Sequence, residues 1–179
     1  DLYTSYINGS SWYYPTYLTV CNGKLFWGQL GYGTGGGGYT LWAYDGSASP
    51  VAMVSSSLFP QYESCYNNNV YFQGRDNTAG VNDYEVWKSD GTAAGTVKFF
   101  DADTRTCGSS NCSGSPTNFR VANNKLFFTA SSSSGTELYV SDGTTTTLID
   151  ILSGSGSSSP SFLTVHDNAV WFIANDGVH

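Results

Sequence analysis

Four acidic side chains near the middle of the chain could perform acid–base chemistry: Asp83, Glu85, Asp101 and Asp103. Glycoside hydrolysis uses such a pair, in which one carboxylic acid protonates the leaving oxygen while the other carboxylate attacks the sugar or activates water. A catalytic acid should be unique in its protein, whereas three other aspartates recur at one place in a repeated pattern: Asp45, Asp90 and Asp142. A glycoside hydrolase with an unrecognised carboxylate pair is therefore kept as an alternative, and we expect the chain not to be an enzyme.

Other sites for catalysis, cofactors or metals have weaker support. Gly31, Gly33 and Gly36 match G-x-G-x-x-G, but that motif must open a helix in a βαβ unit, and no helical pattern follows. A serine triad would have to use His166 or His179, and no G-x-S-x-G motif presents a serine. Two histidines and four dispersed cysteines do not form paired zinc ligands, and no calcium-loop motif occurs. We expect no catalytic residue, cofactor or metal, and we interpret His166 as a satisfied structural histidine near a turn.

Charge and composition exclude several classes of protein. The 179 residues include 14 acidic and 7 basic side chains, a net charge of -7, so binding to nucleic acid is not expected. Hydrophobic residues make up 40% of the chain, which is enough for one sizeable core. Gly, Ser or Asn interrupts every apolar run well before the roughly 20 residues that a spanning helix needs, so no membrane insertion is expected.

The cysteines and the glycosylation sequons favour an extracellular, secreted or cell-surface location. Cys107 and Cys112 enclose a turn-rich segment and are the favoured disulfide pair. Cys21 and Cys65 lie one position apart in the repeat described below, so a disulfide between successive repeats is a second possibility, with other pairings left open. Two N-x-S/T sequons predict glycosylation sites: Asn8 and Asn111.

A turn-bounded apolar segment recurs four times in the chain, about 45 residues apart. It covers residues 23–27, 69–72, 124–128 and 168–172. A second segment follows it in each complete unit and contains Asp-Gly, at residues 41–47, 86–92 and 138–144. Each unit also opens on a proline: Pro15, Pro60, Pro116 and Pro160. The chain is therefore predicted to contain three complete copies and one partial copy of a single repeat.

Each unit is predicted to contain four short strands. In the third unit they cover residues 118–121, 125–130, 137–141 and 146–152, which are rich in aromatic and β-branched residues. Asp-Gly favours tight hairpin turns and is expected to join the third strand to the fourth, at Asp45-Gly46, Asp90-Gly91 and Asp142-Gly143. Asn22-Gly23 and Asn123-Asn124 are expected to join the first strand to the second. No segment places apolar side chains at helical spacing, so the chain is predicted to be all-β.

Four antiparallel strands repeated at this period are typical of the blades of a β-propeller. We therefore predict a β-propeller, or a propeller segment, of about four four-stranded blades. A β-sandwich is the alternative, although it gives no reason for the same landmarks to recur. The single repeat domain covers residues 1–179, with a last-strand segment at 1–14, repeat 1 at 15–59, repeat 2 at 60–115, repeat 3 at 116–159 and partial repeat 4 at 160–179.

Residues 85–96 and 137–144, which read EVWKSDGTAAGT and ELYVSDGT, resemble the E-L-W-x-x-D-G-T repeats of bacterial secreted and surface proteins, sometimes grouped with hyalin-like repeats. The resemblance extends over essentially the whole chain. The first unit departs from it, with Thr40 in place of the acidic residue and Ser47 in place of threonine. The resemblance implies a propeller-like β-repeat on large extracellular proteins, and it implies no catalytic residues.

The two ends of the chain look permuted relative to the repeat. Aligning Pro15 with Pro160 places residues 2–7 opposite residues 147–152, so the chain begins in a fourth strand and stops inside a hairpin loop. We expect a processed product or a segment of a longer protein. The N-terminal strand is expected to complete the last blade of its own molecule or of a neighbouring copy, and the second arrangement would build a filament.

The leading hypothesis is a non-enzymatic extracellular structural or interaction module of a bacterial surface assembly, which strand exchange would make the subunit of a filament. The expected partners are further copies of the chain or other extracellular proteins. A glycan-binding, lectin-like module is the alternative, in which Trp12, Tyr13 and Tyr14 would stack on sugar rings. Burial of these three aromatic residues between blades is the simpler interpretation.

Overall fold

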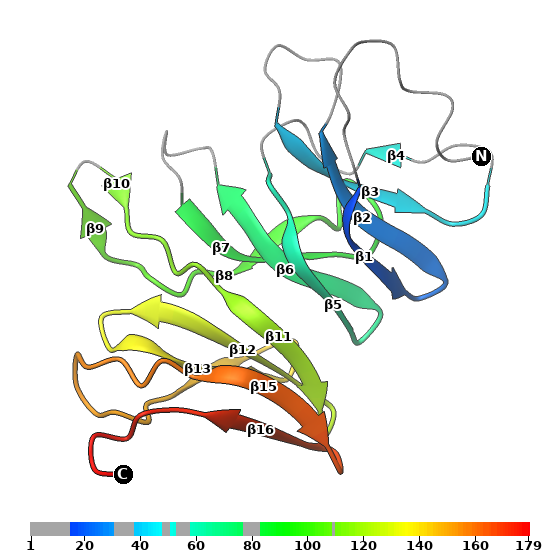
Figure 1. Ribbon diagram of the computed structural model, residues 1–179. Coiled ribbons are helices and arrows are strands. Elements are labelled where there is room, and N and C mark those ends of the chain that lie inside the picture. Colours follow the sequence, from blue (N-terminus) through cyan, green and yellow to red (C-terminus); the bar gives the residue numbers. More distant parts are fainter. Residues whose placement is uncertain (1–14, 31–37, 48–50, 53–57, 77–82, 109) are drawn as a thin grey trace.

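The computed structural model describes residues 15–30, 38–47, 51–52, 58–76, 83–108 and 110–179 (Figure 1). The described residues form short strands joined by turns, and no helix is present among them. Every pairing between these strands is antiparallel. The prediction of an all-β chain is therefore confirmed.

Three four-stranded sheets follow one another along the chain, each with its strands in sequence order, and we call each sheet a blade. Blade 1 consists of β1 (Thr16–Cys21), β2 (Lys24–Leu30), β3 (Tyr39–Tyr44) and β4 (Val51–Ala52). Blade 2 consists of β5 (Gln61–Tyr66), β6 (Asn69–Asp76), β7 (Asp83–Ser89) and β8 (Val97–Phe100). Blade 3 consists of β11 (Thr117–Ala122), β12 (Lys125–Ser132), β13 (Gly135–Ser141) and β14 (Thr146–Ile149). Each complete unit of the repeat thus forms its own small sheet.

Two hairpins complete the described structure. β9 (Thr106–Cys107) and β10 (Ser110–Asn111) form a small hairpin in the segment that connects blade 2 to blade 3. β15 (Ser161–His166) and β16 (Ala169–Ile173) form a two-stranded sheet, which we call the terminal hairpin. Among the described residues, β16 pairs on one side only, with β15.

Turn residues in the left-handed region set the register of the first two strands in every unit. Their φ angles are positive at both central positions, as a two-residue type I′ turn requires: Asn22 and Gly23, Asn67 and Asn68, Asn123 and Asn124, Asp167 and Asn168. Asparagine, aspartate and glycine tolerate this region better than other residues. The predicted turns at Asn22-Gly23 and Asn123-Asn124 are confirmed.

The Asp-Gly pairs lie between the third and fourth strands, as predicted. In blade 2, Asp90 Oδ1 accepts hydrogen bonds from Thr92 N at 2.8 Å and Thr92 Oγ1 at 2.7 Å. The hydrogen bond from the Thr92 hydroxyl is the main reason that the pKa of Asp90 is lowered. Gly91 follows with a φ of 89°, which glycine adopts without strain. Asp142 and Gly143 repeat the aspartate cap and the positive φ in blade 3.

The structure corrects the predicted end of the fourth strand in repeat 3. The sequence pattern extended it to Leu152, whereas β14 ends at Ile149. Ile151 N donates to Oε2 of the Glu137 side chain on β13 at 3.1 Å instead of to a backbone carbonyl of that strand. A side-chain acceptor therefore draws the backbone out of the sheet two residues after β14.

The first strand of each unit contains a β-bulge two residues after its proline. The bulged residue has a positive φ in every unit: Tyr17, Tyr62, Asn118 and Phe162. A bulge bends its strand and increases the local twist. Because the bend recurs at one place, the four first strands have similar shapes, and neighbouring ones are in contact: β1 with β5, β5 with β11 and β11 with β15 (Figure 1).

Successive blades pack face to face, because alternation along each strand gives a blade two faces. The forward face of a blade contacts the next unit, and the back face contacts the preceding one. One core joins the forward face of blade 1 (Cys21, Phe26, Leu41, Ala43) to blade 2 (Leu58, Val70, Phe72). A second core joins the forward face of blade 2 (Tyr66, Tyr71, Val86) to blade 3 (Phe119, Leu126, Phe128, Ala130, Tyr139). Burying one large apolar side chain here stabilises the fold by roughly 1.5–3 kcal/mol.

The blades form an open series among the described residues, with blade 1 at one end and the terminal hairpin at the other (Figure 1). No described sheet closes this series into a ring. The N-terminal strand expected to close it falls in residues 1–14, outside the described residues.

Candidate functional site

The acidic residue of the repeated motif holds the segment that connects one blade to the next. In blade 2, the Glu85 carboxylate is fully buried and accepts hydrogen bonds from Ala102 N at 2.7 Å and Gly114 N at 2.7 Å. Ala102 lies just after β8 and Gly114 just before β11, so Glu85 joins both ends of the connection. A Cβ at Gly114 would lie 2.7 Å from Glu85 Oε2, so only glycine allows this close approach.

Glu137 repeats the arrangement in blade 3, where it is also fully buried. Its Oε2 accepts from Ile151 N at 3.1 Å and from the Ser158 hydroxyl, and its Oε1 accepts from Ser158 N at 2.7 Å. Ile151 and Ser158 occupy the repeat positions of Ala102 and Gly114. The motif glutamate is thus an acceptor for the blade-to-blade connection.

The acids considered for catalysis gather around Glu85 in a buried setting. Asp83, two residues earlier on β7, has no exposed surface, and burial raises its pKa. Burial likewise raises the pKa of Glu85 to about 8, although its backbone hydrogen bonds act in the opposite direction. Asp101 Oδ2 lies 3.5 Å from Lys98 Nζ. Since neither Asp83 nor Glu85 reaches the surface, neither can contact a sugar in this arrangement.

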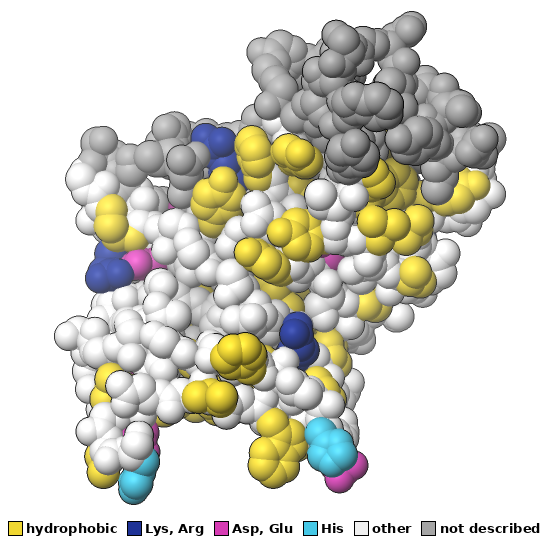
Figure 2. Space-filling model, in the orientation of Figure 1, with side chains coloured by type: hydrophobic (Ala, Val, Ile, Leu, Met, Phe, Trp, Pro, Cys, Tyr) yellow, Lys and Arg dark blue, Asp and Glu magenta, His cyan; other side chains and the backbone are white. Residues whose placement is uncertain are grey.

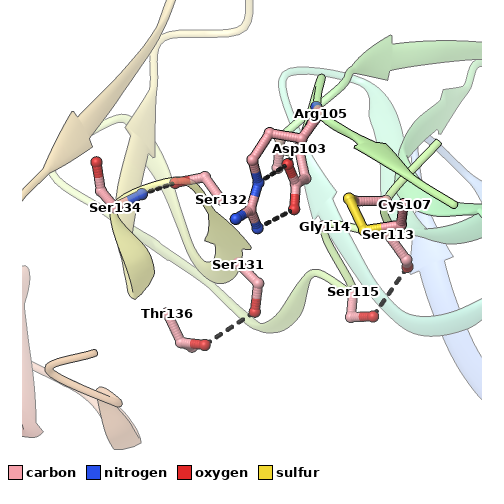
Figure 3. A network of polar contacts seen from close by, with 12 residues as sticks. Asp103, Arg105, Cys107, Ser113, Gly114, Ser115, Ser131, Ser132, Ser134 and Thr136 are labelled. Carbon is pink, nitrogen blue, oxygen red and sulfur yellow. Dashed lines mark hydrogen bonds and ion pairs between the residues drawn. A yellow bond between two sulfur atoms is a disulfide. The ribbon is translucent and has the colours of Figure 1, made fainter. Parts of the chain in front are cut away.

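Asp103 is engaged with Arg105 (Figure 3). The guanidinium donates from Nε to Oδ1 at 2.7 Å and from Nη2 to Oδ2 at 2.6 Å, and these bonds lower the pKa of Asp103. The pair stands at the start of the insertion that carries β9 and β10. On the other side of this insertion, Ser131 N of β12 donates to Gly114 O at 2.7 Å. The Asp103–Arg105 pair is therefore internal to the connecting segment, which the Ser131–Gly114 hydrogen bond attaches to β12.

The favoured Cys107–Cys112 disulfide and the Cys21–Cys65 disulfide that was left as a possibility are both present. Cys21 at the end of β1 is bonded to Cys65 of β5, so the bond crosses from the forward face of blade 1 to the back face of blade 2. Cys107 is bonded to Cys112 and closes the β9–β10 hairpin. The predicted sequon residue Asn111 is exposed on β10. Two disulfides indicate an oxidising compartment, of which the extracellular space is the common one.

Glu63 is a half-buried acid that sequence reasoning missed; its two carboxyl oxygens are buried, and it lies on the back face of blade 2. Its position in the first strand is that of Phe119 in blade 3 and Leu163 in the terminal hairpin, both buried. Burial raises the pKa of Glu63 to about 8. A charged residue at a repeat position that is otherwise apolar was the signal that could have revealed it.

Glu63 should make the stability of the fold depend on pH. A carboxyl group whose pKa is about 8 in the folded protein, against 4.5 as its ordinary value, stays protonated in the fold between these two values. Its favourable contribution is complete below the ordinary value and is lost as the pH rises, at up to about 1.4 kcal/mol per pH unit. Glu63→Gln removes this loss, so the variant should gain stability relative to the wild type between about pH 5 and about pH 8.

Urea unfolding of both proteins across that pH range measures the difference. The other buried acids, Asp83 and Glu85, are present in both proteins, so the comparison isolates Glu63. Parallel pH profiles for the two proteins would show that Glu63 is not protonated in the fold.

The terminal hairpin carries several highly exposed large apolar side chains. Phe162 is 78% exposed, Trp171 64% and Ile173 65%. Trp171 occupies the forward-face position that Phe26 and Tyr71 fill in blades 1 and 2, where each is 1% exposed. Figure 2 shows apolar side chains standing out at the lower end of the molecule, where Figure 1 places the terminal hairpin. The forward face of this hairpin is uncovered in the structure.

The opposite end of the series exposes the complementary face. On the back face of blade 1, Leu18 is 58% exposed and Val20 is 69% exposed. The residues at the position of Leu18 in blade 3 and in the terminal hairpin, Phe119 and Leu163, are 3% and 1% exposed. Each end of the series thus displays one half of the interface that is buried between blades.

The remaining predicted site residues are either exposed or outside the described part. The latter are Asn8, Trp12, Tyr13, Tyr14, Gly31, Gly33 and Gly36. His166 is exposed instead of packed in a core, and its Nε2 lies 3.3 Å from Asp167 Oδ2. His179 Nδ1 lies 2.8 Å from Asp176 Oδ2.

Within the described ranges, no group of three or more His, Cys, Asp or Glu side chains could hold a metal ion. The same ranges contain no helix with the length and apolar character needed to cross a bilayer.

Comparisons with protein-family models, with curated proteins and with solved structures found no match for this chain. The similarity to E-L-W-x-x-D-G-T repeats stays a prediction. The geometry nevertheless explains the motif in this chain: the glutamate holds the connection to the next blade, and the Asp-Gly pair forms the turn before the fourth strand.

Proposed function

We propose that this protein is a non-enzymatic extracellular structural and interaction module of a bacterial surface assembly, and that its copies join into a filament by strand exchange. In this proposal the three blades and the terminal hairpin are four units of a β-propeller or propeller segment. The two disulfides and the resemblance to E-L-W-x-x-D-G-T surface repeats support the extracellular location.

The observation that carries the proposal is the open terminal hairpin. Among the described residues β16 is paired with β15 alone, whereas β12, its counterpart in blade 3, is paired on both sides. Trp171 and Ile173 on β16 are mostly exposed. An unpaired strand edge with exposed apolar side chains is a template for a further strand.

The N-terminal segment is the proposed donor of that strand. Residues 2–7 align with the fourth-strand region of repeat 3 when the prolines of the units are matched. These residues lie outside the described part, so the assignment rests on the sequence pattern. In the complete blades a third strand lies between the second strand and the fourth, so donation to β16 of a neighbouring copy would place residues 2–7 at the third-strand position and join the copies continuously.

Electron microscopy of the native protein should show regular filaments. A synthetic peptide of residues 1–14, added in molar excess, should compete with the donor segment and shorten them. A peptide with the same composition in scrambled order should leave the filament length unchanged. Isolated monomers in the native sample would contradict the proposal, and filaments indifferent to the peptide would exclude strand exchange by this segment.

The alternative functions draw less support from the described residues. A glycoside hydrolase needs accessible acids, and Asp83 and Glu85 are buried. A glycan-binding module would use Trp12, Tyr13 and Tyr14, which lie outside the described part.

A further inference from the structure

We infer that copies of this protein stack head to tail, with the forward face of the terminal hairpin of one copy packed against the back face of blade 1 of the next. The inference rests on the proposed self-assembly and names the two surfaces that it uses. Each surface is one half of an interface that the molecule already forms between its own blades.

The first strands show which backbone contacts this interface uses. Thr19 Oγ1 of β1 donates to Glu63 O of β5 at 3.2 Å, and Arg120 Nε of β11 donates to Leu163 O of β15 at 2.8 Å. Thr19 and Arg120 occupy the same repeat position, and so do the two acceptors. Thr164 is the corresponding residue of the terminal hairpin and is exposed. Its hydroxyl donates to Phe162 O at 3.0 Å in the single copy, and stacking would turn this donor to β1 of a second copy.

The apolar side chains of the two end surfaces are those that the internal interfaces bury. Inside the molecule, Tyr71 on the forward face of blade 2 packs in one core with Phe119 on the back face of blade 3. Trp171 is the counterpart of Tyr71, and Leu18 is the counterpart of Phe119. Stacking therefore brings Trp171 against Leu18 of the next copy and removes both from water.

An aromatic contact is expected to repeat in the same way. Tyr17 of blade 1 and Tyr62 of blade 2 occupy the same bulge position, and their ring centroids are 5.3 Å apart. Phe162 occupies that position in the terminal hairpin and is 78% exposed. In a head-to-tail stack, Phe162 meets Tyr17 of the next copy.

Chain connectivity links this stacking to strand exchange. After β8 and after β14, the chain runs to the proline of the next unit, whose first strand then packs on the blade just completed. Residues 2–7 precede Pro15 and β1 in the same order. If these residues complete the terminal hairpin of a neighbour, β1 follows directly onto its forward face. Because the two joined surfaces differ, the contact is heterologous and can propagate into a filament.

The native Cys21–Cys65 disulfide provides a direct test. It joins a forward-face position of blade 1 to a back-face position of blade 2, with a Cα–Cα distance of 5.2 Å. The equivalent positions at the two ends of the series are His166 and Val20. Mixing His166→Cys protein with Val20→Cys protein under mild oxidation should give a covalent dimer in which peptide mapping finds the bond between positions 166 and 20.

The matched control replaces the first partner by Thr147→Cys, an exposed position on β14 of blade 3 and therefore outside the terminal hairpin. Mixing Thr147→Cys with Val20→Cys should give no such dimer. Filaments that form without the bond between positions 166 and 20 would overturn the stacking and leave self-assembly intact. Native material without any assembly would overturn both proposals. The doubly substituted protein should link between copies, and an intrachain bond in a monomer would show ring closure instead.

Trp171→Asp is a second variant that does not depend on disulfide formation. Its side chain is already largely exposed, so the isolated fold should survive, whereas the stacking surface gains an unpaired charge. We expect loss of filaments with unchanged circular dichroism. Ile149→Asp, at an exposed apolar position on β14, should keep the filaments. Filaments formed equally well by Trp171→Asp would overturn the inference.

Discussion

Replacement of Glu137 by alanine is expected to lower the free energy of unfolding by about 3 kcal/mol. The substitution leaves three buried or half-buried donors without their acceptor: Ile151 N, Ser158 N and the Ser158 hydroxyl. Each such donor costs on the order of 1 kcal/mol or more when it is buried without a partner. Glu137→Gln should cost less, because its amide oxygen still accepts while its amide nitrogen cannot.

Urea unfolding measures the loss of stability, and amide hydrogen exchange shows which residues lose protection. Residues 150–160, which connect blade 3 to the terminal hairpin, should lose protection in Glu137→Ala before the blades do. The exposed neighbour Asp150 provides the control, since Asp150→Ala should change the stability by no more than about 0.5 kcal/mol. Equal effects of the two substitutions would show that the glutamate does not hold the connection.

Removal of the Cys21–Cys65 disulfide by a double alanine substitution is expected to lower the free energy of unfolding by about 4 kcal/mol. The cysteines are 44 residues apart, so the bond restricts a long loop of the unfolded chain. Cys21 is also 1% exposed within the core between blades 1 and 2, so alanine removes packing as well. The effect combines a restriction on the unfolded state with a contact in the folded one.

The second disulfide is the natural comparison. Cys107 and Cys112 are 5 residues apart, and the same relation predicts a loss of only about 2 kcal/mol for their double alanine variant. Denaturant unfolding of the two variants should therefore give clearly different midpoints. Similar losses would mean that loop length does not govern the contribution of these bonds.

Much of the fold could be predicted because its signals are local. The pairs Asn22-Gly23 and Asn123-Asn124 adopt positive φ at both positions, and this property of the residues sets the turn whatever surrounds it. The strands predicted in repeat 3 agree with β11, β12 and β13 to within two residues at every end. The fourth strand was predicted too long, because Ile151 N donates to the Glu137 side chain of β13 instead of to a backbone carbonyl of the sheet.

The candidate site was harder to predict, because burial depends on which faces meet. The acids around Glu85 were candidates only for the alternative of a hydrolase. In the structure the Glu85 carboxyl accepts hydrogen bonds from Ala102 N and Gly114 N, which lie 17 and 29 residues away. Glu63 carries no local signal of burial, and its raised pKa arises from packing on the back face of blade 2. Only comparison with the apolar residues at its repeat position could have indicated it.

Residue types and spacing alone predicted an all-β repeat protein with Asp-Gly and Asn-rich turns. They also placed both observed disulfides among the pairings considered. These features depend on backbone preferences and on the order of residues, which act over a few positions. The tertiary structure alone decided that the motif glutamates hold the connections between blades, that the carboxyl oxygens of Glu63 are buried, and that Trp171 is exposed while its counterpart Tyr71 is not. The reason is that exposure and hydrogen bonding are set by the neighbouring blade, and identical positions of the repeat have different neighbours at the ends of the series.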